Sequence, residues 1–257
     1  MQVFRYVAWN VNSIRARLPI VEKFVEEFEP DVLMLQEIKC MKESFPYSAF
    51  PGYNSIVYGQ KSYNGVAVLV SKKYSVFEAE PIDTGPKDVR MLKVNTELGC
   101  FISVYVPNGA GSVEREEFKK SFLRKIATVV NECRGDRLVI GGDFNVALTD
   151  EDVQFPTKDR LESVLCREDF RAEMRHMLEK CALNDYLGEG RYTWWDYREP
   201  YKGLRIDYVL SRGVPGLQSV IAKYRRMKLE IFDEESKLFL VGPSDHAPVV
   251  FTERRSI

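Results

Sequence analysis

The sequence holds very little histidine, and its cysteines show no metal-binding spacing. Only His176 and His246 occur among 257 residues, and no His-Glu-x-x-His pattern is present. Zinc hydrolases usually bind their metal through several His or Cys ligands at workable spacing. The five cysteines are odd in number and include no Cys-x-x-Cys pattern. We therefore expect scattered free thiols, with neither a disulfide framework nor a zinc site.

The chain also lacks an excess of charge, an export leader and a membrane-spanning run. Lys and Arg total 37 against 38 for Asp and Glu, so the formal net charge is -1. Binding to a polyanion would then depend on local basic clusters. The first residues show no cationic leader with a long apolar stretch, and no apolar run approaches the length that spans a bilayer. We expect a cytoplasmic protein with no membrane partner.

No internal repeat, low-complexity tract or flexible linker divides the chain. With 45% hydrophobic side chains, 257 residues can bury a large core, and one α/β domain of this size is not unusual. We therefore expect residues 1–257 to form a single domain.

Hydrophobic periodicity predicts a mixture of strands and helices. Apolar residues at i, i+3, i+4 and i+7 predict a short helix from Val21 to Phe28, which Pro30 ends, and a longer helical stripe follows Ser112. A third helix is expected near residues 167–181. Expected strands cover residues 3–9, 31–37, 65–70, 91–95, 100–106, 138–140, 192–197, 206–210 and 248–251. The predicted fold is a four-layer α/β sandwich of two packed mixed β-sheets flanked by helices.

Polar side chains adjoin apolar strands at five places. These places are Asn10-Val11-Asn12, Glu37, Asp143-Phe144-Asn145, Arg205-Ile206-Asp207 and Ser244-Asp245-His246. Each one alone also fits an ordinary turn, a solvated carboxylate or a structural ion pair. Together they favour a functional site, because strand ends hold side chains rigidly. Asp143 and Asn145 would share a face if the extended geometry continued past the strand.

The side chains at these places offer mainly hard oxygen atoms. Carboxylate and amide oxygens suit Mg²⁺ or Mn²⁺, which typically assist phosphate chemistry. The sequence contains no Walker loop and no kinase-type glycine-rich loop, so a diester in a polymer is a better candidate than a nucleotide γ-phosphate. The residues by themselves therefore predict a hydrolytic phosphodiesterase.

Seven short segments are informative as an ordered set. They are Trp9-Asn10-Val11-Asn12-Ser13-Ile14-Arg15-Ala16, Leu35-Gln36-Glu37, Tyr105-Val106-Pro107-Asn108-Gly109, Gly142-Asp143-Phe144-Asn145, Thr193-Trp194-Trp195, Arg205-Ile206-Asp207-Tyr208 and Ser244-Asp245-His246. The set resembles the motifs of the exonuclease III family of abasic-site (AP) endonucleases, within the endonuclease/exonuclease/phosphatase superfamily. Tyr105 stands where the DNase I-like and inositol-phosphatase branches tend to carry a His, which favours the DNA-repair branch. The resemblance covers nearly the whole chain and implies a single catalytic domain.

The resemblance implies a metal-binding group around Glu37. Glu37 would anchor Mg²⁺, for which Mn²⁺ would substitute. Asn12 and Asp245 would lie nearby as direct or water-mediated ligands. Asn10 belongs to the same group and would also donate a hydrogen bond to a phosphate oxygen.

The resemblance also implies catalytic roles for five residues. Asp143 would orient or deprotonate the attacking water, while Asn145 would donate to a phosphate oxygen. Asp207 would fix the tautomer of His246, and His246 and Tyr105 would stabilise the pentavalent phosphorus. Asp143 is a better candidate base than a Tyr105 phenolate, because an unperturbed phenol with a pKa of ~10 stays protonated at neutral pH.

Recognition of damaged DNA in the family uses a pocket for an extrahelical sugar. Trp194, Leu204 and Ile206 occupy the positions of its wall, and Leu204 departs from the Trp that is common there. The expected DNA-binding residues are Arg15, Arg17, Lys61, Tyr63, Asn64, Arg225 and Arg226. The last two belong to a basic cluster, with Lys223 and Lys228, that fits equally well a solvated face balanced by the acidic residues 233–235.

The predicted function is Mg²⁺-dependent cleavage 5′ to an abasic site in duplex DNA, leaving a 3′-hydroxyl, together with 3′-to-5′ exonuclease activity. The alternatives are another superfamily phosphoesterase, such as an RNase or phosphatase, and a catalytically dead DNA-binding module. The expected partner is double-stranded DNA with abasic sites. No obligate protein partner is expected, and a sliding clamp is a candidate partner.

Overall fold

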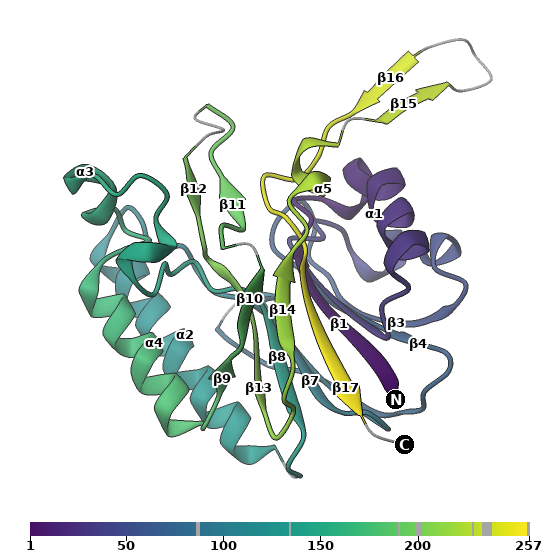
Figure 1. The fold of residues 1–257 in the computed structure, drawn as a ribbon, viewed down its shortest axis with the longest axis horizontal. Helices are drawn as coiled ribbons and strands as arrows, with labels where there is room; N and C mark the ends of the chain where they lie inside the picture. Colours follow the sequence, from purple (N-terminus) through teal and green to yellow (C-terminus); the bar gives the residue numbers. More distant parts are fainter. Residues whose placement is uncertain are drawn as a thin grey trace.

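Two β-sheets form the centre of the computed structural model, which describes residues 1–85, 88–133, 135–189, 191–198, 202–227, 229–232 and 238–255 (Figure 1). The first sheet has the order β10 (Leu187–Glu189), β14 (Leu217–Val220), β17 (Val249–Arg255), β1 (Gln2–Asn10), β2 (Val32–Gln36), β4 (Val66–Ser71) and β3 (Tyr53–Tyr58). The second has the order β5 (Val76–Pro81), β6 (Met91–Thr96), β7 (Gly99–Tyr105), β8 (Leu138–Asp143), β13 (Asp207–Arg212) and β9 (Asn184–Asp185). Each sheet contains both parallel and antiparallel pairs.

Two small hairpins and the helices complete the described structure. The hairpins pair β11 (Trp194–Trp195) with β12 (Gly203–Leu204), and β15 (Leu229–Phe232) with β16 (Leu238–Val241). The helices are α1 (Ile14–Phe28), α2 (Val113–Glu132), α3 (Lys158–Leu161), α4 (Glu168–Lys180) and α5 (Lys223–Arg226), with 3-10 turns η1 (Lys42–Ser44), η2 (Tyr47–Ala49) and η3 (Asp150–Asp152). Among the described residues, no helix has the length and apolar composition needed to cross a membrane.

Helices cover the outer face of each sheet, which confirms the predicted four-layer sandwich. On one side, Phe24 of α1 packs with Leu33 and Leu35 of the first sheet. On the other side, α2 and α4 pack on the second sheet (Figure 1). Between the sheets, a third cluster joins Met34 to Phe101 and other side chains of both inner faces. Burial of these apolar surfaces is the main stabilising contribution to the fold.

Strand register brings the polar strand ends together. β1 and β2 are parallel, with Asn10 opposite Gln36, so Glu37 follows directly beside the end of β1. β7 and β8 are also parallel and end on the pair Tyr105 and Asp143. β13 runs antiparallel to β8 and begins with Asp207 opposite Asp143.

The structure departs from the predicted elements at their edges. The first helix begins at Ile14, seven residues before the predicted Val21, because Ser13 caps it and the chain accommodates Pro19 inside it. The predicted strand at 192–197 shrinks to Trp194–Trp195. The sequence analysis missed β3, β5 and β14. β5 is largely exposed, and β3 and β14 are only partly buried, so their apolar patterns are weak.

One buried carboxylate ties the first strand to the last. Glu253 of β17 is 2% exposed and accepts a hydrogen bond from the Tyr6 hydroxyl at 2.7 Å. Arg137 and Arg255 each donate to its Oε1 atom at 2.8 Å. Burial raises the pKa of Glu253, but the hydrogen bonds from Arg255 and Arg137 outweigh it, so the pKa lies below its ordinary value.

We predict that Glu253→Gln lowers the free energy of unfolding by about 1–3 kcal/mol at neutral pH, because it removes one partner of a buried ion pair. A depressed pKa stabilises the fold above the unfolded-state value and loses that effect as pH falls through the folded value. Urea unfolding should therefore show that the difference in the free energy of unfolding between wild type and variant becomes smaller in acid. The exposed Glu78→Gln variant is the control, and a gap independent of pH would contradict the assignment.

Candidate active site

Asp143 is held at the end of β8 by the glycine before it. Gly142 has a φ of 155°, and a Cβ atom there would lie 1.9 Å from the carbonyl oxygen of Val104. Only glycine allows β8 to approach β7 so closely. The Asp143 side chain consequently lies at the junction of three strands, where it is 2% exposed.

The chain turns directly after Asp143. Asn145 has a φ of 52°, so the extended geometry does not continue to Asn145 and the shared face that depended on it does not form. The backbone N–H of Asn145 donates to Asp143 Oδ1 at 2.9 Å, which closes a turn of the Asx type. The Asn145 carboxamide donates to the carbonyl of Val106 at 2.8 Å. Asp143 and Asn145 are therefore coupled through a turn rather than through a shared strand face.

Asn10 links two of the acidic side chains. Its Nδ2 atom donates to Glu37 Oε1 at 2.9 Å and to Asp143 Oδ2 at 3.0 Å. Asn10 is fully buried at the end of β1. One carboxamide thus fixes both carboxylates in one cluster.

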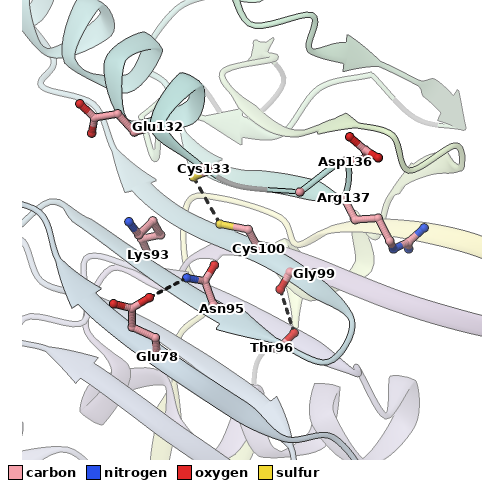
Figure 2. A pocket seen from close by; sticks show the side chains of 11 residues that line it. Glu78, Lys93, Asn95, Thr96, Gly99, Cys100, Glu132, Cys133, Asp136 and Arg137 are labelled. Carbon is pink, nitrogen blue, oxygen red and sulfur yellow. Dashed lines mark hydrogen bonds between the residues drawn. The ribbon is translucent and has the colours of Figure 1, made fainter.

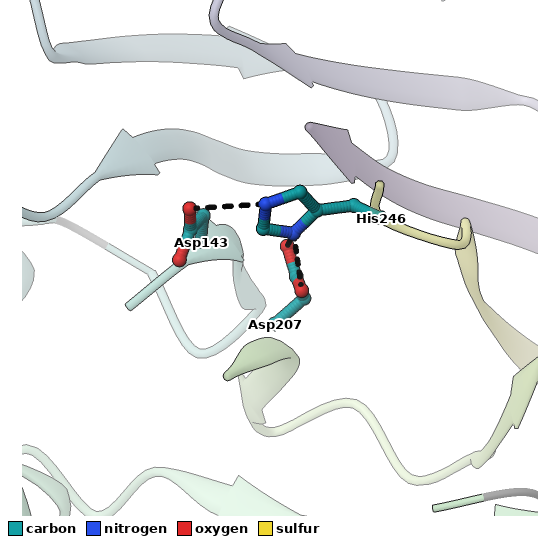
Figure 3. Close-up of side chains that lie close together, drawn as sticks. All are labelled: Asp143, Asp207 and His246. Atoms are coloured by element: carbon teal, nitrogen blue, oxygen red, sulfur yellow. Dashed lines mark hydrogen bonds and ion pairs between the residues drawn. The ribbon is translucent and has the colours of Figure 1, made fainter. Parts of the chain in front are cut away.

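His246 lies between two buried carboxylates (Figure 3). Its Nδ1 atom is 2.8 Å from Asp207 Oδ2, and its Nε2 atom is 3.8 Å from Asp143 Oδ2. The Thr193 hydroxyl accepts the backbone N–H of Asp207 at 3.0 Å and so orients the start of β13. His176 is exposed on α4, away from these strand ends.

The pKa values follow from burial and these close charges. Burial lowers the pKa of His246, but Asp207 outweighs it and raises the pKa to about 10. Burial, followed by the negative charge of Asp207, raises the pKa of Asp143 above its ordinary value. His246 is therefore an imidazolium at neutral pH, next to a carboxyl group whose proton affinity is suited to acid–base chemistry.

Glu37 belongs to an oxygen-rich group at the edge of this cluster. Lys39 Nζ lies 2.7 Å from Glu37 Oε2 and 2.6 Å from Asn12 Oδ1. The Asn12 carboxamide donates to Asp245 Oδ1 at 3.1 Å, and Trp194 Nε1 donates to Asp245 Oδ2 at 3.0 Å. Although burial opposes it, the pKa of Glu37 lies below its ordinary value because Asn10 and Lys39 hydrogen-bond to the charged form.

This group fits a divalent cation. A cationic ammonium already bridges oxygens of Glu37 and Asn12, which are two of the predicted metal ligands. Carboxylate and amide oxygens are the ligands that Mg²⁺ prefers. Asp143, Asp207 and His246 also place ligand atoms within 4.8 Å of one another, but the close hydrogen bond of His246 with Asp207 favours acid–base roles there.

Tyr105 ends β7 beside the same carboxylates. The guanidinium of Arg90 lies 4.6 Å from its ring centroid. Burial, then the charges of Glu37 and Asp143, raise the pKa of Tyr105 well above its ordinary value. Its phenol is therefore protonated at neutral pH and can donate a hydrogen bond.

The three predicted pocket residues divide between a pocket and the core. Trp194 and Leu204 line a pocket of about 410 Å³. Its other lining residues are Thr157, Asp159, Arg160, Ser163, Leu165, Asp196 and Lys202. Ile206 is 2% exposed and packs in an apolar cluster with Leu204. It is not among the residues that line this pocket.

The predicted DNA-binding residues between positions 15 and 64 differ in how exposed their side chains are. Arg15, Lys61 and Tyr63 are exposed. Arg17 donates to the backbone carbonyl of Asn12 at 2.6 Å, so it also supports the loop that carries Asn12. The Asn64 carboxamide contacts Gln60 and Asp88.

Arg225, in the basic cluster around α5, is less available than expected. Arg225 is 9% exposed, and its guanidinium lies 4.4 Å from the ring centroid of Trp195. Lys223 pairs with Glu27. The structure places Arg226 in α5. Lys228 and the acidic residues 233–235 lie outside the described residues. Arg225 thus supports the Trp195 segment from within, in contrast to the expected surface contact.

Three side chains that contact residues of the site had no predicted role. They are Lys39, Thr193 and Lys119. Lys39 follows Glu37 by two residues, and this spacing was the available signal. Thr193 lies inside the recognised Thr-Trp-Trp segment, but its contact with Asp207 is tertiary. Lys119 lies in the helix whose apolar stripe predicts only core packing. Its charged side chain is nevertheless completely buried.

The chain is similar to known proteins over nearly its whole length. The model of the Endonuclease/Exonuclease/phosphatase family matches residues 7–246. Exodeoxyribonuclease III of Haemophilus influenzae is 28% identical over 274 residues, covering 95% of this chain and 98% of the relative.

Solved structures are similar over nearly the same length. A 3′ phosphatase from Neisseria, bound to a product DNA hairpin, has a TM-score of 0.83 and 28% identity, covering 96% of this chain and 98% of that one. An AP endonuclease from Archaeoglobus fulgidus has a TM-score of 0.80 and 29% identity, with the same coverage. The chain therefore belongs to the endonuclease/exonuclease/phosphatase family, in its exonuclease III branch of nucleases.

Proposed function

We propose that this nuclease hydrolyses the phosphodiester 5′ to an abasic site in duplex DNA, in a Mg²⁺-dependent reaction that leaves a 3′-hydroxyl and a 5′-phosphate-bearing abasic end. It also removes nucleotides in the 3′-to-5′ direction. The observation that carries the proposal is the buried Asp143 carboxyl group, fixed by Asn10 and Asn145 and placed 3.8 Å from His246. Relatives described as exodeoxyribonuclease III and AP endonuclease support the choice of DNA.

Asp143 acts as the general base in the proposed reaction. Its raised pKa gives the carboxylate a greater affinity for the proton of an attacking water than an exposed Asp has. The hydrogen bonds from Asn10 and Asn145 fix its orientation. Such fixed geometry lowers the entropic part of the barrier.

His246 stabilises the negative charge that develops on the phosphoryl oxygens. Its imidazolium has one N–H directed at Asp207 and the other ring nitrogen facing Asp143 and the site. The protonated phenol of Tyr105 and the carboxamide of Asn145 donate to the same oxygens. Preorganised donors of this kind are commonly the largest contribution to catalysis.

Glu37, Asn12 and Asp245 would hold the Mg²⁺ ion, with Asn10 beside them. When bound, the ion supplies positive charge to the leaving group and phosphate. The ammonium of Lys39, which lies between Glu37 and Asn12 in the structure, would have to leave that position for the ion to bind.

Substrate selection rests on the pocket and on exposed cations. Trp194 connects the pocket to the site through its hydrogen bond with Asp245. An abasic sugar lacks a stacked base, so turning it out of the duplex is less costly than for a normal nucleotide. Arg15 and Lys61 are exposed and suited to backbone phosphates.

A second candidate activity is removal of a 3′-terminal phosphate. The Neisseria structure of similar fold is described as a 3′ phosphatase. The same base and donors can act on a terminal phosphomonoester, so the substrates must be compared directly.

A substrate panel tests the function. It contains duplex DNA with one tetrahydrofuran abasic analogue, intact duplex, RNA and a 3′-phosphate-terminated duplex, each incubated with Mg²⁺ or with EDTA. We expect Mg²⁺-dependent nicking at the analogue, with slower loss of nucleotides from 3′ ends. Binding without cleavage would remove the enzyme assignment. Equal cutting of RNA would remove the repair assignment, and exclusive release of 3′-phosphate would establish the second candidate.

The base assignment predicts a loss of turnover without a loss of binding. Asp143→Asn removes the proton acceptor but preserves the shape, so kcat should fall at least about 100-fold, while the Kd for abasic duplex changes little. Single-turnover cleavage and fluorescence anisotropy measure the two quantities. The exposed Asp136→Asn variant is the matched control. Retained turnover in Asp143→Asn would exclude Asp143 as the base.

The charge state of His246 can be measured directly, because the chain holds only one other histidine. NMR of histidine-labelled, metal-free protein should show one imidazole with a pKa near 10. His176→Gln assigns the signals. Asp207→Asn should lower the pKa of His246, since Asp207 is the largest cause that raises it. An unchanged His246 titration in that variant would contradict the pairing.

A further inference from the structure

Lys119 of α2 is a fully buried lysine that lies beneath the two loops of the site. Its Nζ atom donates to the backbone carbonyl of Asn145 at 2.8 Å and to that of Asn108 at 3.0 Å. Its ammonium also lies 4.1 Å from the ring centroid of Phe170. The first loop follows β8 and the second follows β7, so a single side chain bridges the segments after both strands.

The residues around Lys119 leave space for its side chain. A Cβ atom at Gly109 would lie 2.8 Å from Lys119 Cδ, so the glycine leaves space for the lysine stem. Burial lowers the pKa of Lys119 to about 7, against the opposing charge of Asp143. Burying an ammonium destabilises a protein relative to a well-packed apolar side chain. A position that carries this cost must gain something other than core stability.

The contacts of Lys119 lead directly to the catalytic groups. Asn145 adopts a left-handed conformation, with a φ of 52°, that is unfavourable for most side chains. Lys119 holds the carbonyl of Asn145, and the N–H of the same residue holds Asp143 Oδ1 at 2.9 Å. The Asn108 carboxamide in turn lies 3.4 Å from Asn145 Oδ1.

We propose that Lys119 is a positioning residue that fixes the turn at Asn145, and through it the direction of the Asp143 carboxylate and the Asn145 carboxamide. The proposal rests on the function proposed above, in that Asp143 and Asn145 act on the scissile phosphate. Lys119 itself does not touch the substrate. Its ammonium replaces the water or backbone partners that the two loop carbonyls would otherwise need.

Lys119→Met tests the proposal, because it keeps the length of the stem and removes the donor. We expect kcat on abasic duplex to fall about 100-fold, the effect of a misplacement of about 1 Å, while KM and the DNA Kd change less than threefold and the melting temperature does not fall. Lys120→Met is the matched control, since Lys120 pairs with Glu117 and Asp169 on the exposed side of α2. A folded Lys119→Met protein with wild-type kcat would overturn the proposal.

Chemical rescue supplies a readout that a packing role alone would not move. Lys119→Ala leaves space for a small amine, and ethylammonium should restore part of kcat in a saturable manner, whereas tetramethylammonium should not. Absence of rescue in folded Lys119→Ala would count against the proposal. Failure of the proposed function gives a different result, because wild type and Lys120→Met would then both leave abasic duplex intact. In that case, kcat of Lys119→Met relative to wild type is measured on the substrate that wild type does cleave.

A second, independent observation concerns two thiols remote from the site. The expectation of free cysteines is confirmed, but they are not all scattered: Cys100 Sγ and Cys133 Sγ are 3.5 Å apart (Figure 2). Cys100 is the second residue of β7, and Cys133 follows the last residue of α2. Both line an open pocket of about 680 Å³ that also contains Lys93, so a small oxidant can reach them.

We infer that Cys100 and Cys133 form a peroxide-sensitive dithiol that oxidises to a reversible disulfide. The Cys133 thiolate attacks the peroxide O–O bond, which gives a sulfenic acid and hydroxide. The Cys100 sulfur then attacks the sulfenic sulfur, and water leaves as the S–S bond forms. The hydrogen bond from Cys100, and after it the positive charge of Lys93, lowers the pKa of Cys133 despite its burial. The bond would join the start of β7 to the end of α2.

Peroxide titration followed by thiol counting and peptide mapping tests this inference. Wild type and Cys40→Ser should each lose two thiols and the mass of two hydrogen atoms, in one linkage between residues 100 and 133 that dithiothreitol reverses. Cys100→Ser and Cys133→Ser should form no internal linkage. The melting temperature of the oxidised wild type should rise by about 5–10 °C, because the bond closes a long loop. Persistence of five thiols in wild type, or sulfinic acid at Cys133 without a linkage, would overturn the inference.

Discussion

The hydrogen bond between His246 and Asp207 is the interaction on which the site depends. Asp143, Asp207 and His246 are all almost completely buried at the end of the two sheets. Two carboxylates in such a place repel each other and disfavour ionisation. An imidazolium between them, 2.8 Å from Asp207, offsets that repulsion and allows the cluster to exist at neutral pH. In the proposed function, the same cation supplies positive charge beside the bound phosphate.

The sheets make this arrangement possible by ending strands at one place. The pair Tyr105 and Asp143 ends β7 and β8, and Asp207 begins β13 opposite Asp143. Asn10 ends β1 in the other sheet and reaches across to Asp143. The geometry of the candidate site is therefore a consequence of strand register, which makes neighbours of groups that are 38 residues (Tyr105 and Asp143) to 133 residues (Asn10 and Asp143) apart in the sequence.

The layers of the fold, and the residues that form the polar cluster, could be predicted from the sequence. The exposed strands and the exact ends of the elements could not. Long apolar runs, such as the one before Glu37, and the helical stripe after Ser112 have strong periodic signals, and the structure contains them. The edge strand β5 is largely exposed and carries a weak pattern. The start of α1 was missed because Pro19 interrupts the expected pattern although Ser13 caps the helix.

The remaining differences arise from tertiary contacts, which residue types alone do not encode. The left-handed turn at Asn145 depends on a hydrogen bond to Asp143 and on the buried ammonium of Lys119. Arg225 was expected to contact DNA from a basic surface, but Trp195 provides an aromatic face that covers its guanidinium. Lys119 lies 26 residues before Asn145, and Trp195 lies 30 residues before Arg225.

We propose that a water molecule activated in this buried cluster attacks phosphorus on the 5′ side of the abasic sugar. Cleavage of abasic duplex in heavy-oxygen water tests this proposal, with the products examined by mass spectrometry. We expect one heavy oxygen in the 5′-terminal phosphate of the abasic fragment and none in the 3′-hydroxyl. Cleavage without incorporation, as in elimination at the sugar, or incorporation into the 3′-hydroxyl would contradict it.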